Sequence, residues 1–255
     1  MGVELTIDGH RADLELNRPE VLNAWNWDVF EGLAKATTEL AHRDDVRVVV
    51  VSGRGRSFSS GIDTTMFAAG ELPAAELIAK AQEGIRNLVA LPVPTIAKVR
   101  GHAYGAGLQL ALACDLCVIT TDAKVGLLEA KYGLIPDLGG AHRLAALAGP
   151  AVAKHMMWLA EKIDGVEAHR RGLAQTLVEP EGLDAAVDEL AERIAAAPPM
   201  VVRGIKKLVD SAARSTFVQS MDDVAAAQEE VMASRDFGEA IGAFLQKRPP
   251  EYTGG

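Results

Sequence analysis

Two acidic side chains near a glycine-rich turn are the residues of this chain best suited to chemistry. Glu129 and Asp137 lie eight residues apart, and Gly105-Ala106-Gly107 precedes both of them. Small residues that open a helix let a ligand approach its first N–H groups, which favour negative charge. The N–H of Ala106 is therefore a candidate donor to an anionic oxygen. Together these residues predict proton transfer on a carbonyl compound.

A second loop supplies another candidate donor. Residues 54–63 follow a predicted strand and are rich in small side chains, at a position where α/β proteins commonly bind ligands. Gly61 permits a sharp turn that leaves the N–H of Ile62 free to face a cleft. Taken alone, residues 54–63 and residues 101–109 are also consistent with ordinary turns. The glycines of residues 101–109 match neither a dinucleotide fingerprint nor a P-loop.

The two acids also have structural interpretations. Asp137 stands just before a predicted helix, where an aspartate commonly serves as the cap. Glu129 could instead form a surface ion pair with Lys131 or Arg143. Their joint position after the glycine turn favours the functional interpretation of both acids.

The elements that must position these residues alternate between strand and helix. We expect a hairpin over residues 3–16, strands at 46–51, 95–99 and 116–120, and helices at 27–42, 73–90 and 107–113. This alternation is typical of an α/β fold with crossover connections. Asp115 is expected to turn the chain into the strand at 116–120, and His102 to pack beside the glycine turn.

The last part of the chain has no strand signals. Amphipathic, Ala-rich helices are expected at residues 183–197, 200–213, 217–233 and 237–247, with a break at Pro198-Pro199. We therefore divide the chain into a core, 1–182, and a C-terminal helical region, 183–255. Physical grounds alone leave open whether this region packs on a neighbouring subunit or on its own core.

Composition limits the class of protein. The chain has 255 residues, 49% of them hydrophobic, with a net charge of −9 and a pI near 5.2, which oppose broad nucleic-acid binding. It lacks the apolar run of a membrane span and the features of a signal peptide, so we expect a soluble, cytoplasmic protein. Cys114 and Cys117 have C-x-x-C spacing, but their apolar surroundings favour two buried thiols over a metal or redox site. No metal site is predicted.

At the residues considered above, the chain resembles the crotonase family, also called the enoyl-CoA hydratase/isomerase superfamily. The resemblance rests on residues 16–24, 58–63, 101–109, 113–115, 133–140 and 244–248, in that order along nearly the whole chain. It implies an α/β spiral of ββα repeats and a C-terminal helical region that builds trimers or dimers of trimers. It also implies an acyl-CoA thioester as substrate and no cofactor, because coenzyme A is part of that substrate.

The resemblance carries over to individual residues. Backbone N–H groups of Ile62 and Ala106 match the donors that hold the thioester oxygen, so an enolate would be stabilised there. Glu129 matches the downstream glutamate of the hydratases. The substrate-binding positions implied are Ala24, Ile62, Asp63, Thr64, Thr65, Ala106, Gln109, Phe244 and Lys247, the last two in some members reaching the coenzyme A of an adjoining subunit.

Gln109 departs from the hydratase pattern, which has a second glutamate there. An amide cannot act as a general acid or base at neutral pH, although it can hydrogen-bond a water. Asp137 matches an acid used by isomerases of the family. We therefore expect an enoyl-CoA isomerase in which Glu129 and Asp137 carry the protons. The alternatives are an enoyl-CoA hydratase that uses Glu129 with a water held by Gln109, and a non-catalytic acyl-CoA binder.

The sequence does not specify the length or branching of the acyl chain, or the metabolic pathway. The pocket for the acyl group is expected to include Met66, Phe67, Tyr104, Tyr132 and Trp158.

Overall fold

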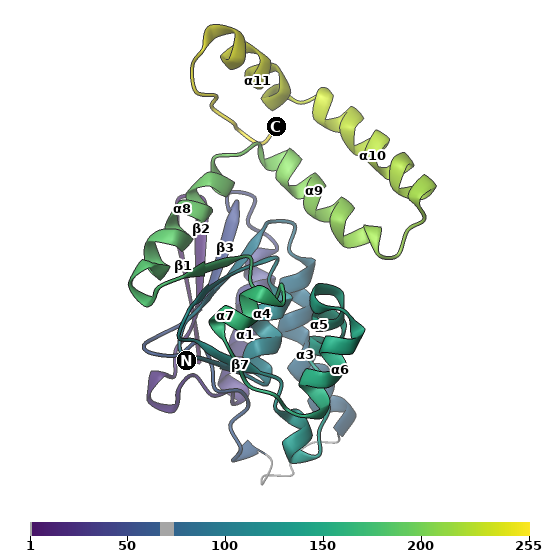
Figure 1. Ribbon diagram of the computed structural model, residues 1–255. Coiled ribbons are helices and arrows are strands. Elements are labelled where there is room, and N and C mark those ends of the chain that lie inside the picture. The colour runs from purple at the N-terminus through teal and green to yellow at the C-terminus, as the bar shows by residue number, and fades with distance from the viewer. Residues whose placement is uncertain (1, 67–73) are drawn as a thin grey trace.

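A six-stranded sheet forms the centre of the computed structural model, which describes residues 2–66 and 74–255 (Figure 1). Its strand order is β1 (Val3–Asp8), β2 (Arg11–Leu16), β3 (Val48–Gly53), β4 (Thr95–Val99), β6 (Leu116–Thr120) and β9 (Thr176–Val178). The hairpin of β1 and β2 is antiparallel, and every other pair is parallel. The predicted hairpin and strands are thereby confirmed.

A smaller sheet carries one of the glycine turns. It consists of β5 (His102–Tyr104), β7 (Lys124–Gly126) and β8 (Ile163–Asp164). Helix α7 (Gly165–Arg170) contacts this sheet, and two further short helices, α5 (Gly140–Ala148) and α6 (Pro150–Trp158), pack on each other. Single turns of 3₁₀ helix lie at η1 (Pro19–Val21), η2 (Glu129–Tyr132) and η3 (Pro180–Gly182).

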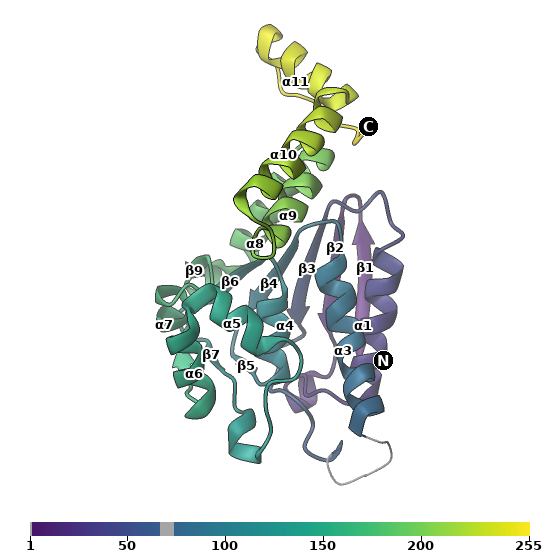
Figure 2. The same cartoon turned by 90° about the vertical axis from the view of Figure 1, so that its right-hand side faces the viewer.

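The run of valines in β3 is explained by burial of both faces of the large sheet. Val49 and Val51 belong to the core cluster on one face, whereas Val48 and Val50 belong to a second cluster on the other. A parallel strand buried on both faces is expected to be apolar without alternation. The first face is covered by α1 (Trp27–Leu40), α3 (Ala74–Ala90) and α4 (Ala106–Ala113), and the second by α8 (Leu183–Ala195) (Figures 1 and 2). Pro73, the expected start of α3, lies outside the described residues.

The C-terminal helices separate into two groups. Helix α8 packs on the sheet, where Leu183, Val187 and Ala191 are buried. Helix α9 (Pro199–Ala212) contacts the core through Lys206, which lies 2.7 Å from Asp115, whereas α10 (Phe217–Met232) and α11 (Arg235–Gln246) extend away from the core (Figures 1 and 2). All four helices were predicted, and α9 begins at the proline pair as expected.

The remaining structural expectations concern single residues. Asp115 accepts hydrogen bonds from the N–H and the hydroxyl of Thr95, at 2.8 and 3.0 Å, which secures the turn into β6. The His102 ring packs on Tyr104 with 5.2 Å between ring centroids. Cys114 and Cys117 are buried free thiols, and burial raises the pKa of Cys117 to about 12. Across the described ranges, no helix has the length and apolar character required to cross a membrane.

Candidate active site

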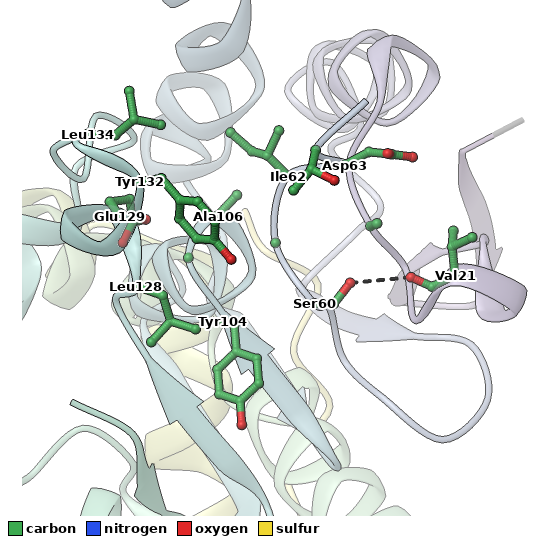
Figure 3. A pocket seen from close by; sticks show the side chains of 14 residues that line it. Val21, Ser60, Ile62, Asp63, Tyr104, Ala106, Leu128, Glu129, Tyr132 and Leu134 are labelled. Atoms are coloured by element: carbon green, nitrogen blue, oxygen red, sulfur yellow. Dashed lines mark hydrogen bonds between the residues drawn. The ribbon is translucent and has the colours of Figure 1, made fainter. Parts of the chain in front are cut away.

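A pocket of about 300 Å³ opens between the loop before α3 and the turn that begins α4. Figure 3 shows Ile62 and Asp63 on one side of it and Ala106, Glu129 and Tyr132 on the other. Its lining in the described part of the chain comprises Val21, Ala24, Ser60, Gly61, Ile62, Asp63, Thr64, Tyr104, Gly105, Ala106, Leu128, Glu129, Tyr132 and Leu134. The pocket therefore brings together segments from residues 21 to 134.

Two backbone N–H groups belong to segments that come close together at this pocket. Ala106 is the first residue of α4, and Gly105 before it has φ of 51°, which favours glycine. Gly61 has φ of 99°, and a Cβ placed on it would lie 3.8 Å from the nitrogen of Ala106. Among the described residues, neither the N–H of Ile62 nor that of Ala106 has an acceptor. Both N–H groups are therefore free of protein acceptors, and their role as donors to a ligand oxygen stays a prediction.

Hydrogen bonds hold the Ile62 loop in place on both sides. The N–H of Trp25 donates to the carbonyl of Gly61 at 2.8 Å, and the N–H of Asp63 donates to the carbonyl of Trp25 at 2.9 Å. Helix α4 contacts the same loop closely, because a Cβ on Gly107 would lie 2.6 Å from the Cβ of Ser59. The donor of Ile62 is thus fixed relative to the helix that supplies the second donor.

Glu129 lines the pocket, and its two carboxylate oxygens differ in their hydrogen-bond partners. It is the first residue of η2, and its Oε1 accepts a hydrogen bond of 2.8 Å from Nε2 of Gln109. Its Oε2 is buried, and no described residue donates to it. Burial raises the pKa of Glu129, the bond from Gln109 lowers it, and the negative charge of Asp137 raises it. A buried carboxylate with one oxygen unpaired is suited to proton transfer.

The surface ion pairs considered for Glu129 do not form among the described residues. The guanidinium of Arg143 instead donates to the carbonyls of Leu112 and Ala113, at 3.0 and 3.2 Å. No ion pair joins Glu129 to Lys131 among the described residues.

Gln109 lies behind Glu129 and is almost fully buried. Its Oε1 accepts hydrogen bonds from the N–H groups of Leu138, at 2.8 Å, and Gly140, at 3.0 Å. Gln109 is not part of the described pocket lining. The carbonyl oxygen of Gln109 thus accepts two hydrogen bonds from the protein backbone.

Asp137 is half-buried on the turn that Gln109 holds. Burial raises the pKa of its carboxyl group. The cap of α5 is Gly139, with no side-chain hydrogen bond, so Asp137 does not cap this helix. Within the described residues Asp137 does not line the pocket, and it acts on Glu129 through its charge. The backbone carbonyl of Asp137 accepts a 2.6 Å hydrogen bond from Gln82 of α3, a residue with no sequence signal for this role.

The predicted coenzyme A contacts fall into two groups. Ala24, Asp63 and Thr64 line the pocket, whereas Thr65 donates to Oδ1 of Asp63 from both its N–H and its hydroxyl group. Oδ2 of Asp63 lies 3.3 Å from the guanidinium of Arg18. Both oxygens of Asp63 are thus engaged by the protein.

Phe244 and Lys247 lie at the end of α11, in the region that extends away from the core, and the pocket of their own chain does not include them (Figure 1). Their assignment to coenzyme A stays a prediction that needs a second subunit.

The expected acyl pocket is matched in part. Tyr104 and Tyr132 line the pocket, Met66 and Trp158 are not among its described lining residues, and Phe67 lies outside the described residues. Sequence reasoning did not single out Val21, Leu128 and Leu134. Val21 and Leu134 lie within residues 16–24 and 133–140, on which the family resemblance rests, and Leu128 directly precedes Glu129. These positions are the signals that could have identified the three residues.

Comparisons with known proteins cover nearly the whole chain. The family model described as Enoyl-CoA hydratase/isomerase matches residues 9–255. The 1,2-epoxyphenylacetyl-CoA isomerase of Escherichia coli (strain K12) is 33% identical over 246 residues, which are 94% of each protein. The crotonyl-CoA hydratase of Syntrophomonas wolfei is also 33% identical, over 243 residues and 94% of each protein.

A solved structure extends this similarity to three dimensions. A protein of Thermobifida fusca YX, crystallised in complex with CoA, superposes with a TM-score of 0.86 at 37% identity and covers 91% of this chain and 93% of its own. The α/β fold with two sheets and C-terminal helices is confirmed.

Proposed function

The chain belongs to the enoyl-CoA hydratase/isomerase family and is an acyl-CoA enzyme of that family, and from this premise we propose that it is an enoyl-CoA isomerase. The substrate proposed is a 3-enoyl-CoA thioester, and the product its conjugated 2-enoyl isomer. One relative is named an isomerase and another a hydratase, so the proposal rests on the site of this chain.

The observation that carries the proposal is the unpaired Oε2 of Glu129. Of the described residues that line the pocket, two are carboxylates, Glu129 and Asp63. Asp63 is engaged on both oxygens by Thr65 and Arg18. One carboxylate oxygen is left to take a proton from a substrate, which suits a reaction that moves a proton and adds no water.

The proposed reaction begins at the thioester carbonyl. Its oxygen lies between the N–H groups of Ile62 and Ala106, which stabilise the negative charge that develops there. Oε2 of Glu129 removes a proton from C2, the electrons of that C–H bond form a C1–C2 double bond, and the carbonyl electrons move onto the oxygen, which gives a dienolate. When the carbonyl re-forms, the C1–C2 double-bond electrons move to C2–C3, and the former C3–C4 double-bond electrons take up at C4 a proton returned by the acid pair of Glu129 and Asp137. Atoms and charge balance without water.

Asp137 is proposed as the second acid of this pair. Its charge raises the proton affinity of Glu129, and its own pKa is raised by burial. Both effects bring the groups closer to the range in which a proton is exchanged at neutral pH.

Hydration is the second candidate, because a crotonyl-CoA hydratase is among the similar proteins. It needs a group that holds and deprotonates water beside Glu129. The carbonyl oxygen of Gln109 already accepts from Leu138 and Gly140, so it has little capacity to accept from a water.

Coenzyme A and a second copy of the chain are the proposed partners. The CoA complex of the Thermobifida protein supports the first. Self-association into a trimer or a dimer of trimers is supported by apolar side chains exposed on α9, α10 and α11: Ile205, Val209, Phe217, Val218, Met221, Phe244 and Leu245. Region 183–255 is thus proposed to join subunits and to bring Phe244 and Lys247 to a neighbouring site.

Mass spectrometry and ultraviolet absorbance on 3-enoyl-CoA and 2-enoyl-CoA of several chain lengths test the proposal. We expect the 3-enoyl thioester to become conjugated with no gain of mass, and Glu129→Gln to lose at least about 100-fold in rate while it still binds the thioester. Glu189→Gln, at an exposed position on α8, is the control. Gain of one water from the 2-enoyl thioester would favour the hydratase. Tight binding without product would favour a non-catalytic binder.

A further inference from the structure

The side chain of Gln109 joins two parts of the active site through a single amide. Its carbonyl oxygen accepts from the N–H groups of Leu138 and Gly140, and its amide nitrogen donates to Oε1 of Glu129 at 2.8 Å. The side chain is 2% exposed, so water does not compete for these bonds. The proton-transfer roles proposed above do not use this residue.

These partners fix the orientation of the amide. If oxygen and nitrogen exchanged places, the NH₂ group would face two N–H donors, and the carbonyl oxygen would face a carboxylate. The two backbone donors therefore force NH₂ toward Glu129. Since NH₂ only donates, Oε1 of Glu129 must accept, and a proton carried by Glu129 resides on Oε2.

We propose that Gln109 is a positioning residue, which ties the 138–140 turn to Glu129 and confines the mobile proton of Glu129 to Oε2, the oxygen that has no partner among the described residues. This inference rests on the proposed function, because it assigns the proton-carrying atom of that reaction. It also gives a physical reason for a glutamine at position 109, where the hydratases of the family have a second glutamate. A carboxylate at position 109 would have no proton to donate to Glu129 unless the two acids shared one.

Close packing supports a fixed amide. A Cβ on Gly140 would lie 2.7 Å from Cγ of Gln109, so the absence of a side chain there lets the N–H of Gly140 approach the amide oxygen. A second glutamine, Gln82 of α3, holds the same turn by its bond to the carbonyl of Asp137. Gln82 has no contact with Glu129 among the described hydrogen bonds, which makes it a matched control.

Three variants separate the two functions of the amide. Gln109→Glu keeps an oxygen for the two backbone donors but loses the donor to Glu129. Gln109→Met removes both interactions at similar length. Gln82→Met loosens the turn and leaves Glu129 with its donor.

The readout is the ionisation of Glu129, followed directly and through catalysis. Carboxyl-carbon NMR of protein labelled with ¹³C-glutamate gives the pH at the midpoint of the Glu129 titration. The signal of Glu129 is assigned by its loss in Glu129→Gln. The pH profile of kcat for the 3-enoyl-CoA substrate gives the acid limb, which falls as Glu129 takes up a proton. The NMR titration does not require turnover, so failure of the isomerase proposal and failure of this inference are distinguishable.

We expect the midpoint of Glu129 to move to higher pH by about one pH unit in Gln109→Met, because a charge-assisted hydrogen bond to the carboxylate is lost. The shift should be larger in Gln109→Glu, which adds a negative charge. In both, kcat should fall at neutral pH with KM changed less than about threefold. Gln82→Met should keep the midpoint of the unaltered protein.

An unchanged midpoint in Gln109→Glu would overturn the proposal, and so would an equal shift in Gln82→Met. If Gln109→Met does not fold, Gln109→Glu still decides the question, because it retains the acceptor that the turn requires.

Discussion

Glu129 lies directly against Gly105, the residue that opens α4: a Cβ on Gly105 would be 3.4 Å from Oε1 of Glu129. The proposed base and the turn that bears the Ala106 donor are therefore in contact. A thioester whose oxygen binds that donor would place its neighbouring carbon beside Glu129. The proposed mechanism therefore has its base and one of its oxyanion donors at one place in the pocket.

The backbone donor of Ala106 can be removed by Ala106→Pro. Proline is tolerated at the first position of a helix, where the N–H has no partner within the helix. We expect kcat to fall by about 10² to 10³, the usual effect of losing one oxyanion donor, with little change in thermal unfolding. Ala106→Gly retains the N–H and should keep most of the activity. Equal losses in both variants would show that the side chain of Ala106, and not its N–H, matters.

Glu129 should make the protein less stable at neutral pH than an uncharged side chain would. Burial raises the pKa of Glu129 in the folded protein above its value in the unfolded chain, about 4.3. The cost of ionisation is thus absent below the unfolded pKa, grows as the pH rises above it, and is complete above the folded pKa.

Glu129→Gln is accordingly expected to have a higher Tm than the unaltered protein at pH 7.5, with the difference lost near pH 4. Differential scanning calorimetry at both pH values measures it. Glu189→Gln on the exposed face of α8 should show no such pH-dependent gain. A Tm of Glu129→Gln below that of the unaltered protein at pH 7.5 would contradict a buried, unpaired carboxylate.

The sequence predicted the elements that depend on local pattern. The β-branched run at residues 46–51 identified β3, and Gly61 and Gly105 identified the turns that free two backbone donors. It did not predict the hydrogen bonds from the N–H groups of Leu138 and Gly140 to Gln109. These partners lie 29 and 31 residues away in the chain, and the packing of α5 on α4 brings them together.

The sequence also could not show which surface each helix after residue 183 packs against. An amphipathic pattern indicates that a helix buries one face, but it does not identify the surface that covers this face. Helix α8 finds that surface on the large sheet, through Leu183 and Val187. Helices α9 to α11 have the same type of pattern, yet they leave large apolar side chains exposed, such as Phe217 and Phe244.

Self-association should depend on the exposed apolar side chains of these helices. Phe217→Asp, at a side chain that is 81% exposed, is expected to shift sedimentation-equilibrium mass toward the monomer, because an aspartate would lose its water in an apolar interface. Val166→Asp on α7, also exposed, should leave the mass unchanged. If the unaltered chain sediments as a monomer, the proposed assembly is wrong.

The contact between α9 and the core should contribute to stability through Lys206. Its ammonium lies 2.7 Å from Oδ2 of Asp115 and donates to the carbonyl of Val93 at 2.9 Å, and its side chain is 9% exposed. Lys206→Met removes this cation and leaves the carboxylate partly buried. We expect it to lower the free energy of unfolding by about 3 kcal/mol, as breaking one side of a buried pair does.

Urea unfolding followed by circular dichroism measures this effect. Lys80→Met is the matched control, because Lys80 lies 3.5 Å from Glu31 with both side chains well exposed, and such pairs contribute about 1 kcal/mol or less. Asp115→Asn combined with Lys206→Met should recover part of the loss, since the unpaired charge is then gone. If Lys206→Met costs no more than Lys80→Met, the ion pair does not anchor α9 to the core.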